Sequence, residues 1–343
     1  MHVPDGFFNL PVSVGTGLVA AAGVAVSLRG ARRELDDRTA PMAGLVAAFI
    51  FAAQMLNFPV AAGTSGHLLG GALAAILAGP YTAVLCLAVV LLVQAVFFAD
   101  GGLTALGVNI TLMAIVGSAV GWGVFRLVTR GRPRSRAVAV AGSFLAALVS
   151  VPVVALAFTL LFWLGGTAPI DVAAVAAAMG GVHVLIGIGE GLITALVVSA
   201  VLAVRPDLVY GARGLAGPLV LRTSEGEKVV TPEQPDAQPA RTGLRPFLLG
   251  GGLVALLLAG VVSLFASSAP DGLERVAEDK GFDTVAQPHP LEDGPMADYA
   301  VKGVENEMLA TGAAGVIGVG ITVVAGGLIF TAARRRNRDK AAA

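Results

Sequence analysis

Nine apolar runs do most to decide what this chain can fold into. A membrane-spanning helix needs about 20 apolar residues, and the chain is 56% hydrophobic but only 13% charged. The sequence therefore predicts an all-α integral membrane protein, a Gly/Ala-rich bundle of about seven spans followed by a two-helix C-terminal hairpin. The runs lie at roughly 10–28, 42–60, 66–79, 81–99, 103–125, 137–164, 172–203, 246–268 and 309–332.

The third run, 66–79, is short for a full crossing. It ends at Gly79-Pro80, a pair that breaks helices. We expect either a tilted short helix or a re-entrant helix that its neighbours bury.

The positive charges predict the orientation of the chain. Cytoplasmic loops carry an excess of Lys and Arg. With the N-terminus outside, the inner segments hold 20 of the 23 Lys and Arg residues, and the outer loop 269–308 holds ten acids. We expect a multi-pass protein of the cell (plasma) membrane with an extracytoplasmic N-terminus. The inner segments are 29–41, 126–136, 204–245 and 333–343.

The organisation along the chain follows from one polar stretch. Residues 204–245 contain TSEGEKVVTPEQPDAQPARTG, which is typical of a flexible linker. It separates the seven-span component, 1–203, from a two-span segment, 246–332, and a basic tail, 333–343. Small residues that permit close helix packing lie at Gly117 and Gly121 and at Gly187 and Gly191. The lone cysteine, Cys86, is expected to be a buried thiol.

The first two residues offer three nitrogen donors to one metal ion. The first basic residue, Arg29, follows the first apolar run, so Met1 is expected to remain on the mature protein. The α-amine of Met1, the amide nitrogen of His2 and its Nδ1 can close two fused chelate rings. Nitrogen donors in one plane suit nickel(II) or copper(II) rather than magnesium or calcium. The alternative, an interfacial histidine at a frayed terminus, is favoured for a Met-His pair taken alone.

A fourth nitrogen donor is available at His67. It follows the turn-rich stretch NFPVAAGTSG and opens the short third run, and the charge pattern places it on the same side as Met1. The alternative is an ordinary residue at a helix start. Because two of only four histidines reach one membrane face, we favour a four-nitrogen site at Met1, His2 and His67.

Other polar residues have open roles. Asp5, Asn57, Thr64 and Ser65 could orient His2 or His67, although Asp5 fits a Pro-Asp-Gly turn equally well and the other three fit loop positions better. His183 and Glu190 share one face of the seventh run, where a helix–helix hydrogen bond or a partner contact is favoured over metal passage.

Three motifs carry a family resemblance. The N-terminal MHVPDGF, the stretch NFPVAAGTSGHLLGG and the later GVHVLIGIGEGLIT together resemble the substrate-binding membrane component (CbiM/NikM) of energy-coupling-factor cobalt and nickel transporters. The segment APDGLERVAEDKGF resembles the small companion subunit (CbiN/NikN) of those systems. The resemblance implies a metal site at Met1, His2 and His67, and it implies that the companion segment, with its acidic loop and His289, helps to load that site.

The resemblance also implies partners. These transporters use ATP, but this sequence has no GxxxxGK[ST] phosphate loop. We therefore expect no enzyme activity in this chain, a separate coupling subunit with a pair of ATPases, cobalt(II) or nickel(II) as the transported substrate, no organic cofactor and no nucleic acid. Cobalt and nickel stay undecided. The alternative is a self-sufficient secondary metal permease. Such a protein should carry several charged or His residues within its spans, and this chain offers only His183 and Glu190. An intramembrane metalloprotease would need a motif such as HExxH, which the sequence lacks.

Overall fold

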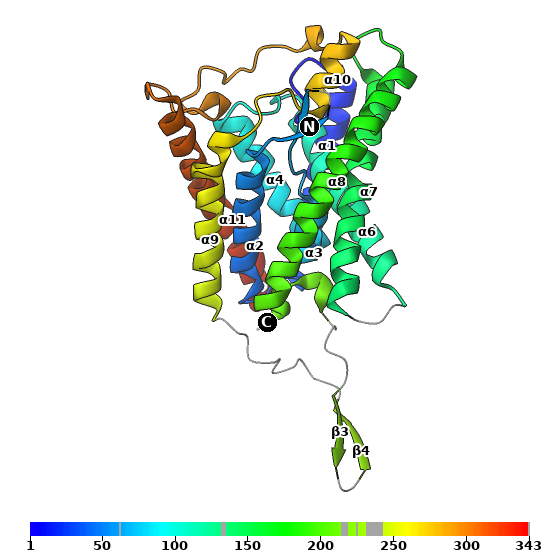
Figure 1. Cartoon of the computed structure of the whole chain (residues 1–343), viewed down its shortest axis with the longest axis vertical. Coiled ribbons are helices and arrows are strands. Elements are labelled where there is room, and N and C mark those ends of the chain that lie inside the picture. Colours follow the sequence, from blue (N-terminus) through cyan, green and yellow to red (C-terminus); the bar gives the residue numbers. More distant parts are fainter. Residues whose placement is uncertain (62, 132–134, 214–218, 224–225, 231–242, 342–343) are drawn as a thin grey trace.

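The computed structural model describes residues 1–343 except 62, 132–134, 214–218, 224–225, 231–242 and 342–343 (Figure 1). Its helices and strands are α1 (Leu10–Gly30), α2 (Thr39–Gln54), β1 (Phe58–Ala61), β2 (Thr64–Gly66), α3 (Gly71–Ala78), α4 (Pro80–Phe97), α5 (Leu106–Asn109), the π-helix η2 (Ile110–Val116), α6 (Gly117–Thr129), α7 (Arg136–Gly165), α8 (Val172–Val204), β3 (Leu219–Thr223), β4 (Gly226–Val230), α9 (Leu244–Gly260), α10 (Gly272–Lys280) and α11 (Glu307–Ala341). Short 3₁₀ helices are η1 (Ala31–Arg33), η3 (Pro206–Leu208), η4 (Tyr210–Ala212), η5 (Val262–Phe265), η6 (Asp283–Val285) and η7 (Ala297–Tyr299).

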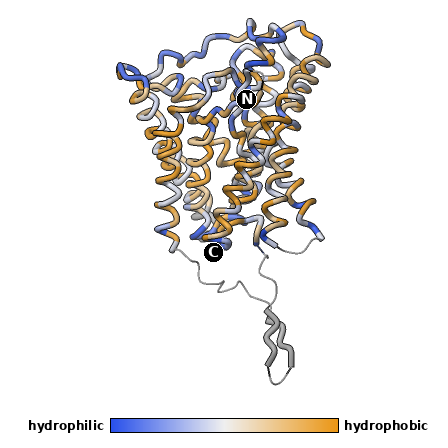
Figure 2. Tube along the Cα trace, in the orientation of Figure 1, coloured by the Kyte–Doolittle hydropathy of each residue, from blue (hydrophilic) through white to orange (hydrophobic). Residues whose placement is uncertain are grey.

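The structure confirms an all-α membrane bundle. Within the described residues, seven helices are long and apolar enough to cross a membrane, and α2 is a shorter apolar helix of 16 residues. Hydrophobic residues predominate along the helices of the bundle (Figure 2), and large apolar side chains are exposed on its outside, where Trp163 and Leu196 are more than half exposed. An exposed apolar face of this extent is suited to lipid.

Polar side chains begin several of the long helices. The Asn9 side chain accepts a hydrogen bond from the Val12 amide at the start of α1. Ser135 does the same for α7 and Asp171 for α8. Each cap satisfies a backbone N–H that has no partner within its own helix.

The third apolar run, 66–79, contains the expected short helix, which its neighbours bury. Only the eight residues of α3 are helical, which is about 12 Å of helix. The β1–β2 hairpin and a non-helical stretch, 67–70, precede them. The run nevertheless ends at the end of the bundle where α1 finishes and α4 begins. There Glu34, which follows α1, accepts hydrogen bonds from the Tyr81 and Thr82 amides.

Small residues allow close contact between helices, as the sequence predicted. A Cβ added at Gly121 would lie 2.6 Å from the Ala72 Cα on α3. A Cβ added at Gly187 would lie 2.9 Å from the Leu148 carbonyl oxygen on α7. Both α6 and α8 therefore pack against their neighbours at distances that a side chain would prevent.

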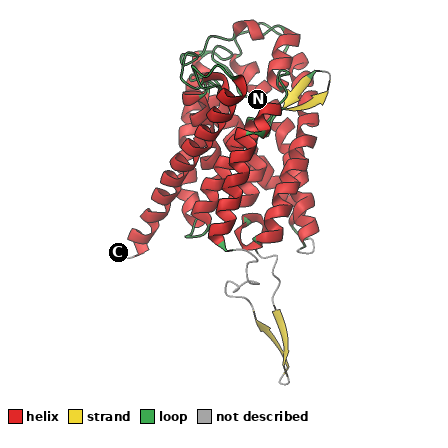
Figure 3. Ribbon diagram, turned by 60° about the vertical axis from the view of Figure 1, so that its left-hand side comes forward, coloured by secondary structure: helices red, strands yellow, loops and turns green. Residues whose placement is uncertain are grey.

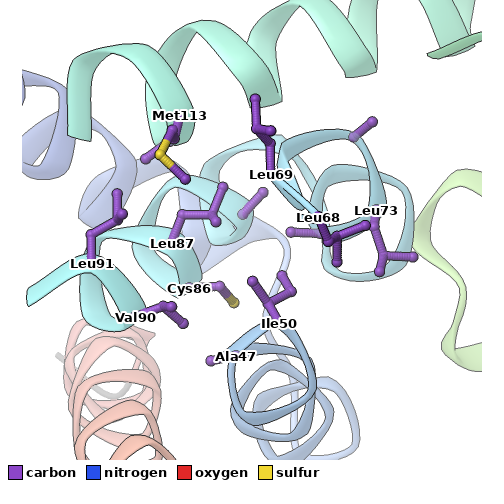
Figure 4. Close-up of a cluster of buried hydrophobic side chains, with 14 of the residues drawn as sticks. Ala47, Ile50, Leu68, Leu69, Leu73, Cys86, Leu87, Val90, Leu91 and Met113 are labelled. Atoms are coloured by element: carbon purple, nitrogen blue, oxygen red, sulfur yellow. The ribbon is translucent and has the colours of Figure 1, made fainter. Parts of the chain in front are cut away.

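Cys86 lies in the core between α2, α3 and α4, as expected (Figure 4). Its thiol faces the Ala43 carbonyl oxygen at 3.4 Å, and Ile50 and Leu87 surround it. Burial of the thiol among these helices agrees with the expected apolar core.

The C-terminal half packs on the first half. Helices α9 and α11 lie against α2, and the segment between them, which includes α10, crosses the end of the bundle near the N-terminus (Figures 1 and 3). The predicted linker 204–245 contains the β3–β4 hairpin; 214–218, 224–225 and 231–242 lie outside the described residues. The predicted basic tail continues α11 as far as Ala341.

Candidate metal centre

The N-terminal segment is inserted into the bundle. Met1 is 3% exposed and Val3 is fully buried. The Val3 amide donates to Oδ1 of Asn109 at 2.8 Å, and Asn109 Nδ2 donates back to the Val3 carbonyl at 3.1 Å. The Gly102 amide also donates to that carbonyl, at 2.9 Å. This backbone pairing fixes where the α-amine of Met1 lies.

The structure brings the α-amine of Met1 into direct contact with Nε2 of His67. His67 is buried, and its Nδ1 lies 3.1 Å from the Leu68 carbonyl oxygen. If Nδ1–H donates to that carbonyl, Nε2 carries the lone pair that faces the amine. Two of the four predicted nitrogen donors therefore meet inside the protein.

The His2 ring lies beside them but is turned differently. It stacks on the His67 ring with 5.0 Å between centroids and 17° between planes. Its Nδ1 lies 3.3 Å from Oδ1 of Asp100, and its Nε2 lies 3.1 Å from Oε1 of Gln94. Burial lowers the pKa of His2 to about 4, so the imidazole is neutral at neutral pH. The structure thus places His2 at the site without aiming its Nδ1 at the Met1 amine.

A carboxylate from the C-terminal half joins this cluster. Oδ2 of Asp271 lies 2.5 Å from the Met1 amine and 3.3 Å from Nε2 of His67. Burial alone would raise the pKa of Asp271, but the positive amine and the His67 hydrogen bond outweigh it and hold that pKa well below its usual range. The sequence analysis missed Asp271. Its one signal was the tripeptide Pro-Asp-Gly, which occurs at 4–6 and again at 270–272.

Of the four polar residues predicted to orient the histidines, Asp5 and Ser65 use their side chains for other hydrogen bonds. Asp5 accepts hydrogen bonds from the Leu103 and Thr104 amides, at 3.2 and 2.7 Å, and so ties the N-terminal segment to the loop after α4. Thr64 is buried in β2.

Ser65 and Asn57 hold the C-terminal half instead. The Ser65 amide donates to the Pro270 carbonyl at 2.9 Å, and Oγ of Ser65 donates to the Ala269 carbonyl at 2.7 Å. The Asn57 carbonyl accepts from the Ser267 amide at 2.8 Å. Asn57 and Ser65, which precede His67 in the sequence, therefore bind residues 267–270 of the C-terminal half through hydrogen bonds.

Glu190 and His183 both reach the neighbourhood of His67. Glu190 accepts hydrogen bonds from the Leu69 and Gly70 amides, at 2.6 and 3.1 Å, and so braces the non-helical stretch after His67. Nδ1 of His183 lies 2.8 Å from the Met179 carbonyl on its own helix. Its Nε2 is buried without a hydrogen-bond partner among the described residues. It lines a small space with Met1, His67 and Asp271.

The donors at this place are of mixed kind. Within the part of the chain that the structure describes, three His, Cys, Asp or Glu side chains are nowhere grouped closely enough to hold a metal ion. The cluster instead joins a backbone amine to one imidazole and one carboxylate, with a second imidazole stacked beside them. Such a set is suited to a borderline divalent ion that accepts nitrogen and oxygen together.

Comparison with known proteins gives the two halves separate relatives. Residues 2–208 match the family CbiM, the cobalt uptake substrate-specific transmembrane region, and residues 245–335 match the PDGLE domain. The first match therefore covers His2 and His67, and the second covers Asp271.

Full-length relatives carry both halves in one chain. The fused nickel transport protein NikMN of Rhodobacter capsulatus is 32% identical over 350 residues, with 96% of each chain covered.

Other relatives match only part of this chain. The cobalt transport protein CbiM of Sorangium cellulosum is 36% identical over 216 residues, which cover 61% of this chain and 94% of the relative. A crystal structure of a truncated transition metal transporter is 29% identical, with a TM-score of 0.53, and the match covers 59% of this chain and 99% of that one.

Proposed function

This chain belongs to the family of cobalt-uptake substrate-specific transmembrane regions, joined here to a PDGLE domain, and we propose that it captures nickel(II) or cobalt(II) at a four-nitrogen site for uptake into the cell. The donors are the Met1 amine, the amide and imidazole nitrogens of His2, and Nε2 of His67. The buried contact between the Met1 amine and Nε2 of His67 is the observation that carries the proposal.

The ligand chemistry supports these ions. A neutral imidazole and an amine are nitrogen donors of the kind that late first-row metals bind, whereas calcium and magnesium prefer several oxygen atoms. The Met1 ammonium must release one proton, and the amide nitrogen of His2 another, before these two nitrogen atoms become ligands. That requirement favours ions with a strong preference for nitrogen.

Completion of the site requires His2 to move. Its Nδ1 faces Asp100 and its Nε2 faces Gln94, so the ring must turn before Nδ1 can join the Met1 amine on one ion. This rotation of the His2 ring replaces its two polar contacts with one bond to the metal ion. Capture is then a two-step event, in which the ion first meets the amine and His67 and afterwards recruits His2.

Uptake needs energy from elsewhere. The sequence has no GxxxxGK[ST] phosphate loop, so a coupling subunit and a pair of ATPases supply the work. The excess of Lys and Arg on the alternate loops puts Met1 on the outer side of the cell membrane, where the ion arrives.

The proposal is tested by nickel titration of the purified chain. His67→Ala should remove high-affinity binding while the protein stays folded, because His67 lies in a non-helical stretch. Ser135→Ala, which removes the side-chain cap of α7, is the control and should bind like the wild type. Wild-type affinity in His67→Ala, with an unchanged thermal transition, would show that the fourth ligand lies elsewhere.

A further inference from the structure

We infer that Asp271 of the PDGLE domain is itself a ligand of the transported ion, supplying Oδ2 as an oxygen donor beside the nitrogen atoms. The inference rests on the proposed four-nitrogen site and adds a donor to it from the other half of the chain. The metal centre of this fused protein is then built by both of its domains.

The two oxygen atoms of Asp271 have separate tasks. Oδ1 accepts hydrogen bonds from the Leu273 and Glu274 amides, at 2.7 and 3.0 Å, and so caps α10. Oδ2 faces the Met1 amine and Nε2 of His67. Nitrogen ligands lie roughly 2.0–2.1 Å from a bound first-row ion such as zinc. An ion that binds both Met1 and His67 is therefore brought next to Oδ2.

The backbone on either side of Asp271 is held in place. Ser65 binds the two preceding carbonyl groups, and the Glu274 side chain accepts from the Asp271 amide at 2.8 Å. A Cβ added at Gly272 would lie 2.6 Å from Ile186 and 3.0 Å from Cε1 of His183 on α8. Because α10 is seated this closely, the carboxylate is fixed at the metal centre rather than sampling it from a mobile loop.

The space beside Asp271 holds a buried nitrogen atom that lacks a partner. Nε2 of His183 lines it together with Met1, His67 and Asp271, and it has no hydrogen-bond partner among the described residues. A buried polar atom left unpaired is costly. A cation bound at Asp271 would therefore lie close to this nitrogen.

Charge balance also requires an anion here. A divalent ion in a buried site is unfavourable unless nearby charges compensate it. The deprotonated amide of His2 carries one negative charge, and Asp271 carries the second. Together they neutralise the ion, which the uncharged imidazoles and amine cannot do.

The test uses the magnetic state of bound nickel in the full chain. Four nitrogen atoms in a plane give diamagnetic nickel(II), whereas an added axial oxygen donor gives a paramagnetic ion. Asp271→Asn keeps a side-chain acceptor that can cap α10 but weakens oxygen ligation. We expect paramagnetic nickel in the wild type, diamagnetic nickel in Asp271→Asn, and an affinity lower on the order of tenfold or more.

A matched control separates capping from ligation. Asp171 caps α8 through the Ala173 amide at 3.0 Å, so Asp171→Asn makes the same chemical change at another helix start and should leave nickel unaltered. Diamagnetic nickel in the wild type, or the same magnetic state in wild type and Asp271→Asn, overturns the inference whatever the affinity.

The His67→Ala titration distinguishes failure of the proposed four-nitrogen site from failure of the proposed role of Asp271. Retention of tight binding in His67→Ala means that the four-nitrogen site itself has failed. Loss of binding in His67→Ala, together with unaltered nickel in Asp271→Asn, means that only the role of Asp271 has failed.

Discussion

The hydroxyl of Tyr299 donates a hydrogen bond of 2.6 Å to Oδ2 of Asp100. The other oxygen of Asp100 lies 3.3 Å from Nδ1 of His2. Tyr299 belongs to the PDGLE domain, so this domain reaches His2 through Asp100 as well as reaching Met1 and His67 through Asp271. The C-terminal half therefore contacts Met1 and His67 directly and His2 through Asp100.

Tyr299→Phe should loosen this second connection. The substitution removes one hydrogen bond to a carboxylate, worth about 1.5–3 kcal/mol, but keeps the ring that stacks on Phe98 at 4.9 Å. We expect a lower thermal transition and a binding site that stays intact. Burial and Asp100 raise the pKa of Tyr299 well above 10, so the contact should persist at alkaline pH. A wild-type transition temperature in Tyr299→Phe would contradict the proposed strength of the bond.

One residue added before Met1 should abolish tight nickel binding. The added residue moves the free amine one peptide unit from His67 and places His2 third in the chain. The buried Met1 site, 3% exposed, also lacks room for it. Calorimetric titration checks this, with a one-residue extension after Ala343 as the control. Unchanged binding by the N-terminally extended protein would refute chelation by the amine.

Glu190 should support the site through the backbone. Its carboxylate accepts from the Leu69 and Gly70 amides, and each buried N–H left unpaired costs about 1–3 kcal/mol. We expect Glu190→Ala to lose roughly 2–5 kcal/mol of stability and to weaken nickel binding through displacement of His67. Glu190→Gln retains one acceptor oxygen, so it should fall between Ala and wild type in a thermal assay. Equal stability of all three proteins would contradict this role.

The two halves should reassemble when expressed apart. Helices α9 and α11 pack against α2, and Ser65 binds the Ala269 and Pro270 carbonyls, so 240–343 should co-purify with 1–215. The fragment 1–215 alone keeps Met1, His2 and His67 but lacks Asp271, and we expect it to bind nickel more weakly. Transport at the full rate by 1–215 without its partner would show that the PDGLE domain has no part in loading.

Local sequence patterns predicted the parts of this protein that depend on local chemistry. Hydropathy predicted the long helices, and the spacing of small residues predicted the close contacts between helices at Gly121 and Gly187. Hydropathy did not predict the full structure of the third run, 66–79. This run includes a non-helical stretch that is stabilised by Glu190, which lies 120 residues later in the sequence. Hydropathy reports burial and does not distinguish a buried extended backbone from a helix.

The site was predictable only where its donors are adjacent in sequence. The proposed chelate at Met1 and His2 follows from their adjacency in the sequence, and His67 was proposed because of its turn-rich surroundings. The contacts of His2 with Gln94 and Asp100, and of Met1 with Asp271, depend on how distant segments dock. Spacing along a chain does not contain that information, so the orientation of the His2 ring and the contribution of Asp271 required the structure.

The burial of Met1 has a consequence for the order in which the protein folds. The N-terminal segment is synthesised first, yet its partners His67, Asn109 and Asp271 follow 66, 106 and 270 residues later. Contacts of such long range form slowly. The contact of Met1 with Asp271 can therefore form only after the chain has been synthesised at least as far as α10. Addition of Asp271 to the metal centre is then a late step of assembly, and a chain whose synthesis stops before α10 lacks this contact.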